Sequence, residues 1–163
     1  MTQQAVSENK EILITREFDA PRQLLWDVWT RSEHIEKWLG PRGFSTRVTE
    51  MDLRVGGKLS YVMIGPDGTE YPGYGVFIEI VPPERIVSTD EFGDNYDQIL
   101  PNVDLPKGTV TTAAFDEIGA RTRLTLTITH STPEDRKKHE NMGVVAGWNS
   151  SLDKLDDYLA EIR

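Results

Sequence analysis

Residues 121–130 show a strict alternation of two kinds of side chain, and this pattern limits the possible folds more than any other feature of the chain. One set is Arg121, Arg123, Thr125, Thr127 and Thr129, and the other is Thr122, Leu124, Leu126, Ile128 and His130. A period of two predicts a β-strand with one face in water and the other on a hydrophobic core. The antiparallel sheet that contains such a strand must be covered on one side by a second layer.

Other segments rich in β-branched and aromatic residues predict the rest of the sheet. They are 11–18, 44–53, 57–64, 70–81, 84–92 and 109–117, and the strand described above extends over 120–130. Short turns such as Pro66-Asp67-Gly68 separate them, so consecutive strands are expected to run antiparallel. The segment 93–106 is too long and too rich in proline for a hairpin turn, and we expect a mobile loop or lid there.

Helical patterns flank the strands. After the first strand, two short helices are predicted, with Asp19 as the N-cap of the first and Ser32 as the N-cap of the second. A third helix is expected to begin with Thr132 as its N-cap and Pro133 at its first position. Apolar residues then recur with a period of 3.6, which predicts one long C-terminal helix. Gly143 and Gly147 weaken its middle, so a bend or a close contact is expected there. This helix is the one predicted element large enough to cover the sheet.

Composition excludes several classes of function. The 163 residues include 18 Lys and Arg but 27 Asp and Glu, for a net charge of −9. Such a chain, with no basic run, is not expected to bind nucleic acids or anionic lipid surfaces. It has no cysteine, which excludes disulfides, thiol nucleophiles and thiolate metal sites. No cofactor motif, metal-ligand spacing or membrane-spanning segment is evident, and we expect a cytoplasmic protein. The length and the polar start predict a flexible segment 1–9 and a single domain over 10–163.

Aromatic and polar side chains on the predicted inner face of the sheet suggest a small-molecule pocket against the long helix. The predicted lining is Trp38, Tyr61, Met63, Tyr74, Val76, His130, Val145 and Trp148. Ordinary core packing accounts for each of these residues as well. Alternation along 73–81 also places Ile78 on the inner face. A histidine at the end of an apolar stripe, such as His130, is more often a hydrogen-bonded core residue than an acid–base group.

Several short motifs, in this order, resemble one known family. They are Leu25-Trp26-Asp27-Val28-Trp29-Thr30, Trp38-Leu39-Gly40-Pro41, Asp52-Leu53-Arg54-Val55-Gly56-Gly57, Phe115-Asp116-Glu117 and Gly147-Trp148. The sequence is similar, over roughly residues 10–162, to the family related to the activator of the ninety-kilodalton heat-shock chaperone ATPase, within the START-like, birch-pollen-allergen-like superfamily. The resemblance implies an α+β helix-grip fold, in which a curved antiparallel sheet of six to seven strands wraps around the long C-terminal helix.

Three functions stay open at this point. The first is binding of an apolar or aromatic small molecule between helix and sheet, as the resemblance implies. The second is a protein-interaction module, such as a chaperone activator in the stress response. The third is a cyclase or dehydratase in which His130 and the hydroxyl of Tyr61 or Tyr74 transfer protons. Asp90 and Glu91 are expected to face solvent, and His139 is expected on an exposed helix face. Both a monomer and a homodimer are compatible with the sequence.

Overall fold

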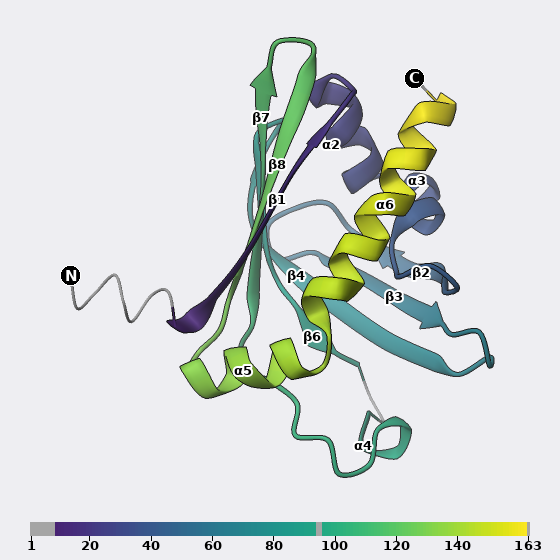
Figure 1. Ribbon diagram of the computed structural model, residues 1–163, viewed down its shortest axis with the longest axis vertical. Coiled ribbons are helices and arrows are strands. Elements are labelled where there is room, and N and C mark those ends of the chain that lie inside the picture. The colour runs from purple at the N-terminus through teal and green to yellow at the C-terminus, as the bar shows by residue number, and fades with distance from the viewer. Residues whose placement is uncertain (1–8, 94–95, 163) are drawn as a thin grey trace.

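The computed structural model describes residues 9–93 and 96–162 and shows a curved sheet with helices on its concave side (Figure 1). The α+β helix-grip prediction is confirmed: the sheet is antiparallel and unclosed, and a C-terminal helix lies against it. Of the segment predicted to be flexible, 1–9, only Asn9 is among these residues, so that prediction lies outside the description.

Eight strands form the sheet, one more than the upper limit predicted from the sequence. They are β1 (Glu11–Phe18), β2 (Ser45–Met51), β3 (Lys58–Ile64), β4 (Glu70–Val81), β5 (Arg85–Thr89), β6 (Glu91–Phe92), β7 (Val110–Ile118) and β8 (Arg121–Thr129). Their spatial order is β1-β8-β7-β5-β4-β3-β2, and β6 pairs with β4. The extra strand arises because the predicted strand 84–92 divides at Asp90 into β5 and β6.

The long C-terminal helix predicted from the sequence is two helices. The described helices are α2 (Arg22–Thr30), α3 (Ser32–Trp38), α4 (Tyr96–Ile99), α5 (Pro133–Asn141) and α6 (Val144–Ile162). Gly143 separates the last two with a φ of +84°, a left-handed conformation that glycine adopts without steric cost. Figure 1 shows α5 and α6 meeting at an angle, so that α5 lies across the end of the sheet. The short α4 lies inside the predicted loop 93–106.

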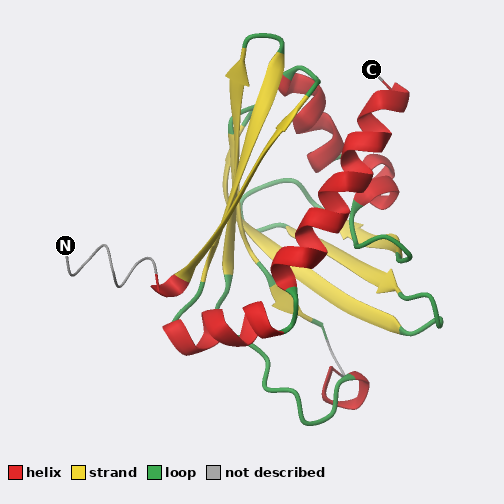
Figure 2. Cartoon of the chain, in the orientation of Figure 1, coloured by secondary structure: helices red, strands yellow, loops and turns green. Residues whose placement is uncertain are grey.

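Helix α6 covers the inner face of the sheet (Figure 2). Its Leu152, Leu155 and Leu159 are buried in one core cluster with Leu126 and Ile128 of β8. The alternation predicted for 121–130 is confirmed, because Thr122, Leu124, Leu126, Ile128 and His130 are all at most 2% exposed. Burial of these apolar side chains is the main source of stability for the contact between helix and sheet.

A β-bulge in β4 changes which side chains face inward. The pairing of β4 with β5 joins Phe77 to Ser88 and Ile80 to Ile86, with a register shift between them. Phe77 is therefore 5% exposed while its neighbour Ile78 is 48% exposed. The prediction that Ile78 faces inward is wrong, because a bulge inserts one unpaired residue and reverses the alternation beyond it.

Only one of the three predicted helix caps is present. The Thr132 hydroxyl accepts a hydrogen bond from the main-chain N–H of Asp135 at 3.0 Å, as predicted for the start of α5. The other two predictions are wrong. Pro21 is the N-cap of α2 and Arg31 is the N-cap of α3, and neither provides a side-chain cap.

Thr132→Ala is expected to lower the free energy of unfolding by about 1 kcal/mol, since it leaves an N–H of the first turn without its acceptor. Thermal and urea unfolding would measure the change. Ser32→Ala is the matched control, because Ser32 stands inside α3 and caps nothing, and it should change stability by less than about 0.5 kcal/mol. Equal losses in the two variants would show that the Thr132 cap contributes nothing.

Candidate functional site

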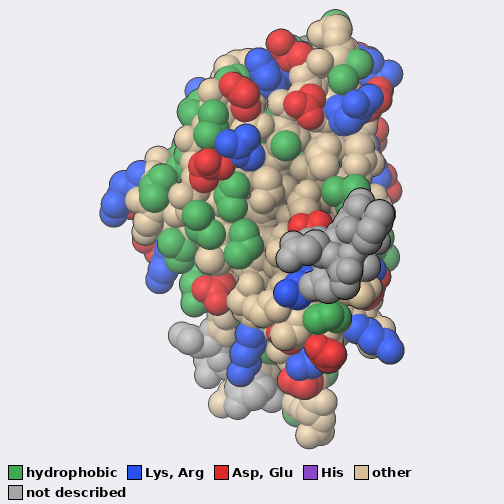
Figure 3. All heavy atoms as spheres, turned by 90° about the vertical axis from the view of Figure 1, so that its left-hand side faces the viewer, with side chains coloured by type: hydrophobic (Ala, Val, Ile, Leu, Met, Phe, Trp, Pro, Cys, Tyr) green, Lys and Arg blue, Asp and Glu red, His purple; other side chains and the backbone are tan. Residues whose placement is uncertain are grey.

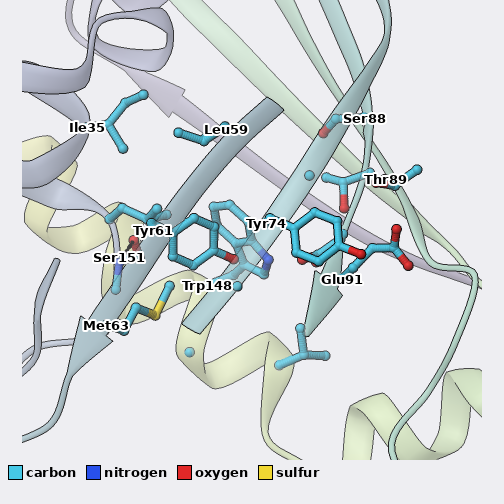
Figure 4. Close-up of a pocket in the computed structure, with 18 of the residues that line it drawn as sticks. Ile35, Leu59, Tyr61, Met63, Tyr74, Ser88, Thr89, Glu91, Trp148 and Ser151 are labelled. Atoms are coloured by element: carbon cyan, nitrogen blue, oxygen red, sulfur yellow. Dashed lines mark hydrogen bonds between the residues drawn. The ribbon is translucent and has the colours of Figure 1, made fainter. Parts of the chain in front are cut away.

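A cavity of about 310 Å³ lies between the inner face of the sheet and the helices (Figure 4). Strands β3, β4, β5 and β7 form its floor, the end of α3 forms one wall, and the junction of α5 and α6 forms another. Its apolar and aromatic lining includes Trp29, Trp38, Leu59, Tyr61, Met63, Tyr71, Phe77, Ile86, Phe92, Tyr96 and Trp148. A mainly apolar wall with a few polar groups is typical of a small-molecule site.

Five of the eight predicted site residues line this cavity, namely Trp38, Tyr61, Met63, Tyr74 and Trp148. Val76, His130 and Val145 are not among the lining residues, so for them the prediction is wrong. Val76 pairs with Lys58 on the outer face of the sheet. Val145 is 39% exposed on the opposite side of α6.

Tyr74 borders the cavity from the other side of the sheet. Strand register pairs it with Ser60, whereas Tyr61 pairs with Gly73 on the inner face. The Lys58 ammonium lies 5.0 Å from the centre of the Tyr74 ring, which holds the ring outside. In Figure 4, Tyr74 lies beside Glu91, on the side of β4 away from Trp148.

Three tryptophans form one wall. The rings of Trp29 and Trp148 are parallel, with centroids 6.1 Å apart, and Trp29 also contacts Trp38 at 4.6 Å. The Trp38 Nε1–H donates to the carbonyl of Val28 at 2.9 Å, so the protein itself satisfies its polar group. Trp148 is only half-buried, which leaves part of its surface for a ligand.

Tyr61 crosses the floor of the cavity above Gly73. A Cβ on Gly73 would lie 2.8 Å from the Tyr61 hydroxyl oxygen, so the absence of a side chain there makes room for the ring. Burial, and to a smaller extent the charge of Asp90, raises the pKa of Tyr61 well above its ordinary value of 10. The hydroxyl therefore stays protonated and can donate a hydrogen bond at neutral pH.

A polar end of the cavity was not predicted from the sequence. It contains the side chains of Ser88, Asp90, Tyr96 and Thr111. The Thr111 hydroxyl oxygen is buried and has no hydrogen-bond partner among the described residues. A buried hydroxyl of this kind normally has a partner, so a bound molecule or water is expected to supply one.

Asp90 is the acidic group of this polar end. Burial raises the pKa of its carboxyl from 3.8 to about 6, and the neighbouring Glu91 adds to the shift. Burial, together with Tyr71 and Asp90, raises the pKa of Tyr96 to about 12. The expectation that Asp90 faces solvent is wrong, because it continues the inward alternation of Ile86 and Ser88.

His130 lies outside the cavity in a hydrogen-bonded pair of histidines. Its Nδ1 is 2.8 Å from the carbonyl oxygen of Lys10 and its Nε2 is 2.9 Å from Nδ1 of His139. Because a carbonyl only accepts, Nδ1 of His130 is the donor, and in the neutral ring Nε2 then accepts from His139. Both ring nitrogens of His130 are thus engaged in hydrogen bonds within the protein. His130 cannot serve as the base in the cavity that the cyclase or dehydratase alternative requires.

His139, by contrast, lines the cavity. It is 8% exposed, although the sequence suggested an exposed helix face. Burial, and then the neighbouring His130, lowers the pKa of His139 from 6.5 to about 4. Its imidazole is therefore neutral at pH 7 and adds no positive charge to the site.

Hydrogen bonds hold the wall at the end of α3. The Ser151 hydroxyl donates to the carbonyl of Trp38 at 3.0 Å and accepts from the N–H of Gly40 at 3.1 Å. The Lys154 ammonium donates to the carbonyl oxygens of Gly40 and Phe44 at 3.1 and 3.3 Å. These bonds fix Gly40 and its neighbours against α6.

Comparison with known proteins identifies the family of the chain. Residues 19–160 match the family model described as Activator of Hsp90 ATPase homolog 1-like protein. The chain belongs to this family. No curated protein sequence matches it.

Solved structures share the family fold. Protein Ms6760 from Mycobacterium smegmatis is 29% identical with a TM-score of 0.83, covering 96% of this chain and 95% of that one. A protein from Arthrobacter aurescens is 29% identical with a TM-score of 0.84, over 95% and 88% of the two chains. Protein NE0264 from Nitrosomonas europaea is 30% identical with a TM-score of 0.77, over 94% and 96%. The fold of this family supports a ligand-binding or interaction module in general.

Within residues 9–93 and 96–162, no group of three or more His, Asp or Glu side chains is arranged to hold a metal ion. In the same part of the chain, no helix has the length and apolar character needed to span a membrane.

Proposed function

We propose that this family member binds an apolar or aromatic small molecule in the cavity between α6 and the sheet. The observation that carries the proposal is the cavity of about 310 Å³ between the inner face of the sheet and the helices. That volume lies at the lower end of the range of about 300–1,000 Å³ for ligand sites. Stacked Trp29 and Trp148 provide a flat apolar wall, and the buried Thr111 hydroxyl provides a free polar contact.

Titration with the neutral fluorescent probe phenylnaphthylamine tests this proposal. The native protein is expected to bind the probe saturably, and Trp148→Ala should weaken binding roughly tenfold by removing the stacking surface. Val145→Ala is the matched control, because Val145 lies on the same helix but does not line the cavity, and it should leave affinity unchanged. Extraction of the purified protein, followed by mass spectrometry, would identify a co-purifying ligand. Absence of both saturable binding and an extracted ligand would contradict the proposal.

A second candidate function is protein binding through the outer face of the sheet. Figure 3 shows hydrophobic side chains gathered on this face. Exposed apolar residues of the sheet include Leu13 of β1, which is 67% exposed, and Ile78 of β4, which is 48% exposed. The family description suggests the ninety-kilodalton heat-shock chaperone as the partner.

The rate of ATP hydrolysis by this purified chaperone separates the two candidates. A chaperone activator would raise the rate, and Ile78→Glu would remove the effect by placing a charge on the apolar face. If the chain acts only through its cavity, adding it leaves the rate unchanged.

A further inference from the structure

We propose that the ligand of the cavity is an organic cation, an aromatic or apolar amine whose ammonium group pairs with Asp90. This inference rests on the proposed function, because it names the class of molecule that the same cavity binds. It depends on three observations: the charges that line the cavity, the placement of Asp90, and the aromatic rings around it.

The charges that line the cavity have one sign. Two acidic residues, Asp90 and Glu91, border it, whereas no Lys or Arg is among the lining residues that the structure describes. The imidazole of His139 is neutral at pH 7 because burial lowers its pKa to about 4. An anionic ligand would therefore meet a carboxylate with no compensating cation, and repulsion in a site of low polarity is strong.

Strand geometry directs Asp90 inward and Glu91 away. Residues of β5 alternate, so Asp90 continues the inner face of Ile86 and Ser88. Glu91 pairs with Tyr74 on the outer face. The N–H of Asp90 donates to the carbonyl of Thr109 at 2.9 Å, which anchors its main chain between β5 and β6.

Asp90 has no partner of opposite charge among the residues that the structure describes. None of the ion pairs between described residues includes it, and its side chain accepts no hydrogen bond from them. A half-buried carboxylate that lacks a cation is costly, and a cationic ligand removes that cost. The Thr111 hydroxyl, buried without a partner nearby, can accept a second hydrogen bond from an ammonium group.

Aromatic rings complete the surroundings of the carboxylate. Tyr96 packs edge-to-face on Phe92 with centroids 4.9 Å apart, and it also contacts Tyr71 at 6.4 Å. Tyr61 and Tyr96 are both close enough for the charge of Asp90 to affect their hydroxyls. Faces of aromatic rings attract ammonium groups, most strongly where water is excluded. A carboxylate among such rings favours an amine over a neutral or acidic analogue of the same shape.

Three naphthalene derivatives of similar size test the inference: naphthylmethylammonium, naphthylmethanol and naphthoate. Isothermal titration calorimetry at pH 7 would measure their affinities for the full chain. We expect the ammonium to bind at least about tenfold more tightly than the alcohol, as is typical of hydrogen bonds to charged groups, and naphthoate to bind most weakly.

Asp90→Asn is expected to weaken binding of the ammonium about ten- to a hundredfold and to change binding of the alcohol by less than about threefold. Asp116→Asn is the matched control: it removes the same charge from an exposed residue of β7 that does not line the cavity, and it should alter ammonium binding by less than about threefold. Equal losses in the two variants would overturn the role of Asp90.

The outcomes for the native protein separate this inference from the proposed function. If the alcohol binds and the ammonium binds no more tightly, the preference for a cation is overturned while small-molecule binding stands. If none of the three binds and the neutral probe does not bind either, the proposed function itself is overturned.

Discussion

Replacing Asp90 with asparagine is expected to raise the free energy of unfolding of the ligand-free protein by about 2 kcal/mol near pH 7. Burial raises the pKa of the carboxyl from 3.8 to about 6, so the folded state disfavours the ionised form that prevails at pH 7. A shift of about two units corresponds to about 3 kcal/mol. Because Asp90 is only half-buried, water screens part of the effect and reduces it to about 2 kcal/mol.

The dependence on pH has a definite sign. Between pH 3.8 and about 6, the folded state holds a proton that the unfolded chain has released. The contribution of Asp90 to stability is therefore present at low pH and is lost as the pH rises through this window. The gain from Asp90→Asn should shrink below pH 6 and vanish near pH 4, where the carboxyl is neutral in both states.

Urea unfolding of both proteins between pH 4.5 and pH 7.5 would measure this gain. Asp52→Asn is the control: the Asp52 carboxylate is exposed and pairs with Arg54 at 2.8 Å, so its loss should lower stability by no more than about 1 kcal/mol. A decrease in stability for Asp90→Asn at pH 7 would contradict the prediction, since it would mean that the carboxylate makes a favourable contact in the ligand-free protein.

Such a gain would also bear on function. A residue that lowers the stability of the protein, and whose replacement raises it, is typical of a binding site. Asp90 lines the cavity, and so does Thr111, whose buried hydroxyl has no partner among the described residues. The two groups are best explained together, as contacts that a ligand completes.

The strands whose two faces differ sharply in polarity could be predicted from the sequence. β1 matches the predicted segment 11–18, and β8 falls within the predicted segment 120–130. In both strands the inward residues are mainly apolar and the outward ones are mostly polar. β1 ends at the predicted residue, Phe18, which is fully buried. The position of α6 against the sheet follows from the same reasoning, since the inner face needs a cover.

The inward face of β4 could not be predicted in the same way. Alternation within the strand placed Tyr74, Val76 and Ile78 inward, whereas the register with β3 and β5 places them outward. The bulge after Phe77 depends on how two strands pair, and a pattern within one strand does not contain that information.

Asp90 and His139 show a second limit. Acidic residues and histidines on surface helices are most often exposed, so both residues were predicted to face solvent. Asp90 is half-buried because the inward alternation of β5 continues past the strand end. His139 is buried because the chain turns at Gly143 and lays α5 over the end of the cavity. The alternation before Asp90 was a usable signal, but the turn that positions His139 is a tertiary feature.

Between pH 7 and pH 4 the native protein is expected to lose about 3 kcal/mol of stability through His139, and replacing this residue with asparagine should abolish that loss. Burial, and then the neighbouring His130, lowers the pKa of His139 from 6.5 to about 4. The unfolded chain takes up a proton below pH 6.5 that the folded protein does not take up until about pH 4, so stability is lost as the pH falls through this window. Asparagine does not titrate, and the stability of the variant relative to the native protein should rise by about 3 kcal/mol from pH 7 to pH 4.

His139→Gln is the matched control. An asparagine amide nitrogen lies near the position of Nδ1 and keeps the donor to Nε2 of His130, now 2.9 Å away, whereas glutamine leaves that buried acceptor unpaired. Both variants should show the same pH dependence, with glutamine less stable at every pH by about 1–2 kcal/mol. As the pH changes, Asp90 and His139 shift the free energy of unfolding in opposite directions over overlapping pH ranges. The two effects therefore partly cancel in the native protein, and urea unfolding of the single variants separates them. Parallel curves for the native protein and both variants would mean that His139 takes up its proton in the folded state as readily as in the unfolded chain.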